Sequence, residues 1–185
     1  VTGTYTSWQA VTMDNVSVSR GSFTWGSGNS VTQSTSITDT TKAFVLTTYR
    51  TTQGSGIIDS PDDLYTTGEI TDGSTLTFRR GSTGSEANVV AYEVVEFSDH
   101  TTVSSGNIAI NSGSSTGSDS LNVNASESAV IFQGMGPTYG RTDAVGETNV
   151  NSAKALITSF TNTALNITRG TTTGNANFQY FVLDF

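Results

Sequence analysis

The sequence predicts an all-β protein of two tandem antiparallel β-sandwich modules, either jelly-roll-like or six-stranded, related by internal duplication. Three observations predict this fold: a duplicated residue pattern, short apolar or alternating runs bounded by turn residues, and a composition rich in Thr, Ser, Asn and Gly. Thr favours strands, and Gly and Asn favour turns. These residue types all have low helix propensity, so the composition argues against a helical fold.

The duplication is clearest at the ends of the two halves. Residues 76–97 read LTFRRGSTGSEANVVAYEVVEF, and residues 165–185 read LNITRGTTTGNANFQYFVLDF. Aligning them needs one single-residue gap, which the residue identities place in the strand after the turn. Two further pairs of segments match upstream in the same order: 21–25 with 106–110, and 38–46 with 124–132. Chance does not explain matches that stay in order across the whole unit.

The repeat divides the chain into an N-terminal arm at 1–13, a first module at 14–97 and a second module at 98–185. Short runs bounded by turn residues predict six strands in each module. In the first module they are expected near 21–26, 31–38, 42–50, 64–70, 74–80 and 88–97. In the second they are expected near 106–111, 119–124, 128–133, 153–160, 163–169 and 176–185.

The connections also carry predictions. The glycine-rich stretches 81–86 and 170–175 predict hairpin turns between the last two strands of each module. Residues 151–160 have an apolar spacing that one or two helical turns could use, although the corresponding Thr- and Gly-rich segment favours a strand. No linker rich in Pro or charge separates the modules, so we expect them to pack end to end with limited freedom.

The N-terminal arm resembles a third copy of the last strand. Residues 8–13 follow the pattern of residues 92–97, and Trp8, Val11 and Met13 are the candidate assembly residues. An ordinary N-terminal strand with a coincidental pattern is one explanation. The alternatives are a longer array of modules, or a strand that completes the sheet of a neighbouring subunit.

Charge and cysteine content exclude several classes of partner. The net charge is −8 with a pI near 4.3, so we expect neither nucleic acid nor a membrane as partner, because both require a basic face. The chain has no cysteine, which rules out disulfides and thiolate metal sites. No apolar stretch approaches the length of a transmembrane helix.

The sequence is poor in groups that could converge for catalysis, and we expect no enzyme. The single histidine, His100, is expected in an exposed loop at the module junction. Glu96 and Asp184 are equivalent by the repeat, which indicates structural roles and not a catalytic pair. Arg80 and Arg169 are equivalent as well, and we expect each to cap a turn or to contact the adjacent module.

One acidic cluster could hold a metal. Asp59, Asp62 and Asp63 place three carboxylates within five residues of a predicted loop, and Ca²⁺ prefers such oxygen ligands. A solvated acidic loop is the more ordinary interpretation, because the run lacks the spacing of an EF-hand. No other cofactor is expected.

Aromatic and basic side chains at strand ends could bind glycans. Tyr49 and Arg50 in the first module, with Tyr139 and Arg141 in the second, are the candidate ligand-binding residues. Their rings would stack on a sugar while the guanidinium groups donate hydrogen bonds. Packing of each tyrosine against the rim of its sandwich is the simpler alternative.

The module ends, YEVVEF with FRRG and YFVLDF with ITRG, resemble repeated β-modules of phage structural proteins and bacterial surface proteins. The strand layout is similar, more weakly, to H-type lectin sandwiches. The first resemblance implies a virion or cell-surface setting and self-assembly or assembly with other structural proteins. The sequence therefore predicts a non-enzymatic decoration, fibre or filament subunit at an extracellular or virion surface. A glycan-binding adhesin is the alternative.

Overall fold

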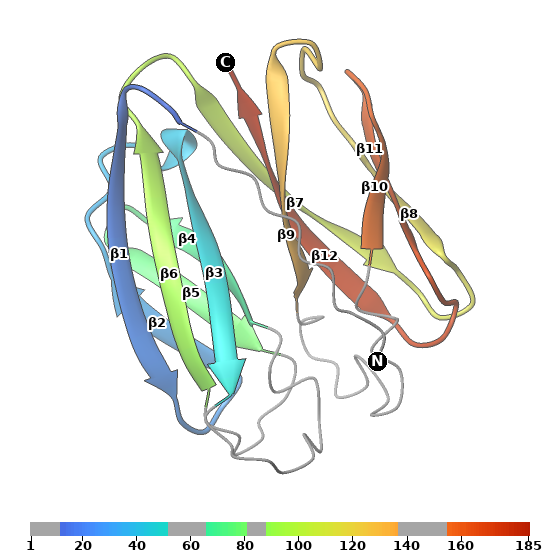
Figure 1. Ribbon diagram of the computed structural model, residues 1–185, viewed down its shortest axis with the longest axis horizontal. Coiled ribbons are helices and arrows are strands. Elements are labelled where there is room, and N and C mark those ends of the chain that lie inside the picture. Colours follow the sequence, from blue (N-terminus) through green and yellow to red (C-terminus); the bar gives the residue numbers. More distant parts are fainter. Residues whose placement is uncertain (1–11, 52–65, 81–87, 137–154) are drawn as a thin grey trace, which may run out of the picture.

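The computed structural model describes residues 12–51, 66–80, 88–136 and 155–185, and over these ranges the chain is almost entirely β (Figure 1). The first six strands are β1 (Val16–Trp25), β2 (Ser30–Ser34), β3 (Ala43–Thr51), β4 (Thr66–Asp72), β5 (Thr75–Arg80) and β6 (Asn88–Phe97). The next six are β7 (Thr102–Ile110), β8 (Thr116–Ser120), β9 (Ser128–Gly136), β10 (Ala155–Phe160), β11 (Ala164–Arg169) and β12 (Ala176–Asp184). A single 3₁₀ turn, η1 (Thr40–Lys42), precedes β3.

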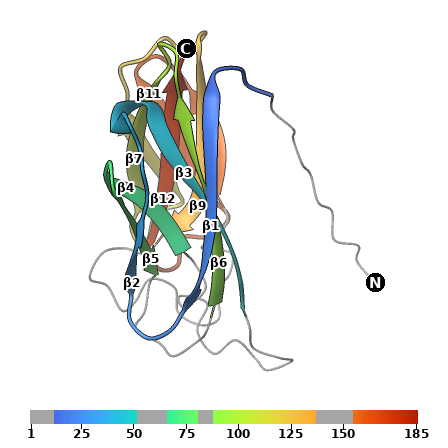
Figure 2. The ribbon, with the colours of Figure 1, turned by 90° about the vertical axis from the view of Figure 1, so that its left-hand side faces the viewer.

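The strands form four three-stranded antiparallel sheets, two from β1–β6 and two from β7–β12, which we call the first and second modules. The first module has the sheets β1-β6-β3 and β2-β5-β4, and the second has β7-β12-β9 and β10-β11-β8. The strand order is the same in both modules, so the expected pair of six-stranded β-sandwiches is confirmed. Figure 2 looks onto the first module, with β1 at the right and β2 at the left.

The prediction of a hairpin between the last two strands of each module is wrong. β5 and β6 belong to different sheets, and so do β11 and β12. The segment 170–175, with Gly174 at a φ of 72°, carries the chain from one sheet to the facing sheet. Residues 81–87 lie outside the described residues. Alternation shows that two strands bury one side each, but it does not show whether they share a sheet or face each other.

The register places the gap of the repeat in the turn and not in the strand. Gly21 pairs with Tyr92 across β1 and β6, and Gly106 pairs with Tyr180 across β7 and β12. Counting along each strand, β6 and β12 then align without interruption from their first residue. Asn88 is then equivalent to Ala176, so the Ala-Asn pairs at 87–88 and 176–177 of the sequence do not occupy equivalent positions. The residues 155–160, where a helical alternative existed, form strand β10.

Each module has its own core between its two sheets. In the first, Trp25, Leu76, Phe78, Val90 and Val94 are buried, and the Phe23 ring lies 5.0 Å from that of Phe78. In the second, the buried core residues include Ile108, Ile110, Leu165, Ile167, Ala176 and Phe178. The rings of Phe132 and Phe178 stack there with centroids 5.7 Å apart.

Candidate functional site

The contact between the modules is the best-defined surface in the molecule. The modules pack side by side and not end to end, with β12 facing the first module (Figure 1). This central strand is buried on both sides. Phe178, Tyr180 and Val182 point into the core of the second module, whereas Phe181 and Leu183 belong to the core cluster of the first. The interface is thus an extension of the first core.

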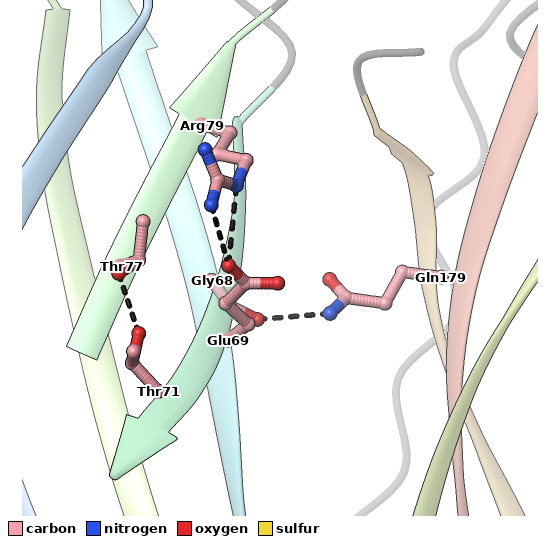
Figure 3. Close-up of polar contacts among 6 residues, drawn as sticks. All are labelled: Gly68, Glu69, Thr71, Thr77, Arg79 and Gln179. Carbon is pink, nitrogen blue, oxygen red and sulfur yellow. Dashed lines mark hydrogen bonds and ion pairs between the residues drawn. The ribbon is translucent and has the colours of Figure 1, made fainter. Parts of the chain in front are cut away.

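Two glutamines fasten the sheet face of the second module to the edge strands of the first. Gln179 Nε2 donates to the backbone oxygen of Gly68 at 3.0 Å (Figure 3). Gln133 Nε2 donates at 3.0 Å both to the backbone oxygen of Val45 and to Thr47 Oγ1. β3 and β4 are edge strands of the described sheets, and these bonds cover part of that edge.

A β-bulge aims Gln133 at the first module. In the β9–β12 ladder, Gln179 pairs with Gly134 and Tyr180 pairs with Phe132, so Gln133 is the extra residue. Such an insertion bends the strand and redirects a side chain, and bulges are common where a strand must make a specific contact.

Aromatic rings and the linker complete the interface. Phe44 and Phe181 have ring centroids 5.7 Å apart, and Phe97 and Phe185 lie edge to face at 6.4 Å. Lys42 Nζ donates to the backbone oxygen of Asp99 at 2.5 Å and so ties the 3₁₀ turn to the linker. Apolar, aromatic and charged contacts therefore hold the two modules in one arrangement.

The repeat-equivalent arginines tie down turns inside each module. Arg80 is buried and donates to the backbone oxygens of Gly26 and Gly28, with its guanidinium 5.1 Å from the Trp25 ring centroid. Arg169 is buried likewise, and burial lowers its pKa. Its bonds reach the backbone oxygens of Asn111, Ser114 and Gly174. Both arginines therefore bond to the turn between the first two strands of their module, and Arg169 also bonds to Gly174 in the segment 170–175.

A glycine and a tyrosine pair in the same way in both modules. A Cβ at Gly21 would overlap the ring of Tyr92, and a Cβ at Gly106 would overlap the ring of Tyr180. Tyr180 Oη also donates to Asp119 Oδ2 at 2.7 Å. Burial, followed by this bond to a carboxylate, raises the pKa of Tyr180 above its usual range.

The repeat-equivalent acids make local structural bonds. Glu96 Oε1 accepts from the backbone nitrogens of Thr38 and Asp39, both at 2.8 Å, and Asp184 accepts from Ser128 Oγ at 2.7 Å. These contacts support the structural interpretation of both carboxylates.

The junction histidine is exposed, as expected. Beside His100, Asp99 accepts a bond from the Thr101 backbone nitrogen at 2.9 Å, and this bond holds the pKa of Asp99 below its usual value.

Tyr49 and Arg50 lie at a shallow depression on the first module. Thr48, Val89 and Ala91 complete its lining, and its volume is about 150 Å³. The Tyr49 side chain is 37% exposed. Ligand pockets usually enclose about 300 Å³ or more, so this surface could contact one sugar ring but could not enclose a larger ligand.

Most of the other expected site residues lie outside the described residues: Trp8, Val11, Tyr139, Arg141, Asp59, Asp62 and Asp63. Met13 is described, and its half-buried side chain packs against the core cluster of the first module. Over the described ranges, no three His, Cys, Asp or Glu side chains come together as metal ligands. The same ranges contain no helix of the length and hydropathy needed to cross a membrane.

Comparison with protein-family models, with curated proteins and with solved structures found no match for this chain. The geometry of the chain itself must therefore support any functional conclusion.

Sequence reasoning missed the two interface glutamines. A signal was present in the last strand, where Phe178–Leu183 is nearly continuous in large residues and contrasts with the alternating last strand of the first module. A continuous run of this kind indicates a strand buried on both faces. The predictions did not use this signal, and the surface that Gln133 and Gln179 contact is seen only in the structure.

Proposed function

We propose that this chain is a non-enzymatic structural subunit of an extracellular or virion surface assembly, such as a decoration protein, a fibre or a filament. The observation that carries the proposal is the docking of one duplicated module on the edge of the other. Phe181 and Leu183 extend the first core, and Gln179 bonds to Gly68 on the edge strand. A pair of sandwiches joined in this way is a rigid building block of the kind that surface assemblies repeat.

The chemistry of the surface supports the same proposal. Charged residues make up only 13% of the chain, so Thr, Ser, Asn and Gly provide much of its polar surface. Glu96, Asp184 and the buried arginines are committed to hydrogen bonds that hold turns and strands. The side chains that a sequence would offer for catalysis therefore serve the fold.

The position of the protein on virions or cells of its source tests the proposal directly. Antibodies raised against the full chain, detected by immunogold electron microscopy, should label regularly spaced positions on virions or on surface appendages. Labelling confined to the cell interior would refute the structural assignment. Antibodies against an abundant internal protein provide the control for access of the label.

The N-terminal arm is a candidate contact between subunits or modules. Met13 packs against the first core, which places the end of the arm on the surface of the first module. Deleting residues 1–13 should weaken assembly or lower the melting temperature, whereas deleting residues 1–7 keeps Trp8 and Met13 and should do neither. If both truncated proteins assemble and melt like the full chain, the arm does not donate a strand.

A glycan-binding adhesin is a second candidate function, favoured by the depression at Tyr49 and Arg50. Tyr49 and Arg50 both line this depression, where the tyrosine ring can stack on a sugar and the arginine can donate hydrogen bonds to it. On a glycan array with calcium present, the full chain should give a signal that Tyr49→Ala removes and Thr32→Ala, on a strand of the other sheet, retains. No signal at high protein concentration would eliminate this candidate.

A further inference from the structure

Three exposed apolar side chains lie on strands at opposite sides of the molecule. Val18 on β1 is 39% exposed, and on β10 Leu156 is 71% and Ile157 is 38% exposed. Figure 1 places β1 at the outer side of the first module and β10 in the second module, away from the contact between them. Both are edge strands, paired on one side only within the described sheets. Exposed apolar groups on an edge strand favour association.

The exposed pair on β10 occupies the position that is a docking point in the first module. Gly68 pairs with Phe78, and Ile157 pairs with Ile167, which is equivalent to Phe78 by the repeat. Ile157 is thus the counterpart of Gly68, whose carbonyl binds the second module. Leu156, which precedes Ile157, leaves the opposite face of the same edge strand and is 71% exposed. Among the described residues, no strand pairs with this edge of the second module, which corresponds to the edge that the first module uses for docking.

Val18 of the first module is equivalent by the repeat to Val103, which lies on the docked sheet face of the second module. Val103 pairs with Leu183, and Val18 pairs with Val95, its counterpart in the first module. Val103 packs against the first core cluster as part of the docked sheet face. The sheet face around Val18 is the equivalent face of the first module, and there the valine is exposed to solvent.

We propose that copies of this chain bind head to tail: the β10 edge at Leu156 and Ile157 of one copy receives the β1-β6-β3 face at Val18 of the next. This deepens the proposed structural function and rests on it. The two surfaces differ, so each copy can bind one neighbour at each end. A contact of this heterologous type extends into an open chain unless its rotation closes a ring.

The contact between copies is expected to be weaker than the contact within the chain. Phe181 in the docked face corresponds to Glu93, which pairs with Arg20 at 2.6 Å, and both of these side chains are substantially exposed. An ion pair gains little at a surface and must be partly desolvated on binding. Association should therefore be reversible and dependent on concentration.

Two charge substitutions test this arrangement in the full chain. Val18→Glu blocks the sheet face and Leu156→Glu blocks the edge, and each replaces an exposed side chain. Thr32→Glu, at an exposed position on β2, is the matched control for an added charge on a strand. Sedimentation velocity across a concentration series measures association, and circular dichroism with thermal melting confirms that each variant is folded.

The unmodified chain and Thr32→Glu should form a series of oligomers, whereas each blocked variant alone should associate at least about 100-fold more weakly, because a buried unpaired charge is costly. An equimolar mixture of the two blocked variants should form a one-to-one dimer, since each retains the surface that the other lacks. A monomeric unmodified chain, or dimers of Val18→Glu with itself, would overturn the arrangement. Labelling of a surface assembly by the antibody, together with a monomeric chain, would retain the proposed function and reject only this inference.

Discussion

Replacing Arg80 with alanine should destabilise the first module far more than replacing its neighbour Arg79. The two side chains leave β5 on opposite faces. Arg80 is 1% exposed and bonds to the backbone oxygens of Gly26 and Gly28. Arg79 forms a surface pair with Glu69, with Nη2 2.9 Å from Oε1 (Figure 3).

The two substitutions should differ in the stability they cost because the two arginine side chains differ in burial. Hydrogen bonds from a charged donor each contribute about 1.5–3 kcal/mol, and a cation near an aromatic face adds about 0.5–2 kcal/mol. Removing Arg80 also removes the cost of burying a guanidinium, and water can reach part of the freed turn. We therefore expect a net loss of about 2–4 kcal/mol. The partly exposed pair of Arg79 and Glu69, whose side chains are 29% and 46% exposed, should contribute at most about 1 kcal/mol.

Urea unfolding followed by Trp25 fluorescence measures this difference, since the Trp25 ring is fully buried and lies next to Arg80. A Trp8→Phe background leaves Trp25 as the single tryptophan. Arg80→Met separates the lost hydrogen bonds from the lost packing, because it keeps most of the length of the side chain. Equal losses for Arg80→Ala and Arg79→Ala would refute the view that buried bonds to the turn hold the module.

Three further predictions concern the second module and the interface. Gly106→Ala should destabilise the fold by about 1–3 kcal/mol by displacing the Tyr180 ring, while Gly170→Ala, with open space around it, should be nearly neutral in calorimetry. Gln179→Leu removes the bond to Gly68 and should lower the stability of the module contact by about 1–3 kcal/mol, seen as separate unfolding of the two modules. Because the folded pKa of Tyr180 is raised, its contribution is complete below the unfolded value near 10 and falls as pH rises above it. Tyr180→Phe should flatten this alkaline loss of stability in melts between about pH 9 and 11.

The fold class was predictable because the repeat and the alternation act locally. Glycines and polar residues bound each apolar run, so all twelve strands could be located, although β1 begins at Val16 and β7 at Thr102, before the expected starts at 21 and 106. The sheet partners could not be predicted in the same way. Leu76 and Val90 bury their side chains toward each other from different sheets, and strands of one hairpin would show the same alternation.

The candidate site was less predictable than the fold, for a physical reason. A docking surface depends on which face of a sheet another module covers. The residue type of a polar side chain does not indicate whether that side chain is covered or exposed. Gln179 is buried and bonded to Gly68, 111 residues away, whereas exposed Tyr49 was the more conspicuous residue in the sequence. The run of large residues around Phe181 was the available signal of a second neighbour, and the predictions did not use it.

The differences between the two copies indicate the neighbours for which each was selected. A duplicated module keeps what the fold requires, as the arginine at the turn and the glycine beneath the tyrosine show. It changes where the surroundings differ. At one outer-face position the copy that is covered within the chain has Phe181, and the uncovered copy has Glu93, paired with Arg20. At the edge, the first module has Gly68, where a Cβ would overlap Phe78 and Thr47, and the second has Ile157, which pairs with Ile167 and is 38% exposed. The size of the paired residue accounts for Ile157 itself, and a neighbouring copy on this edge, as proposed above, would remove its exposed side chain from solvent.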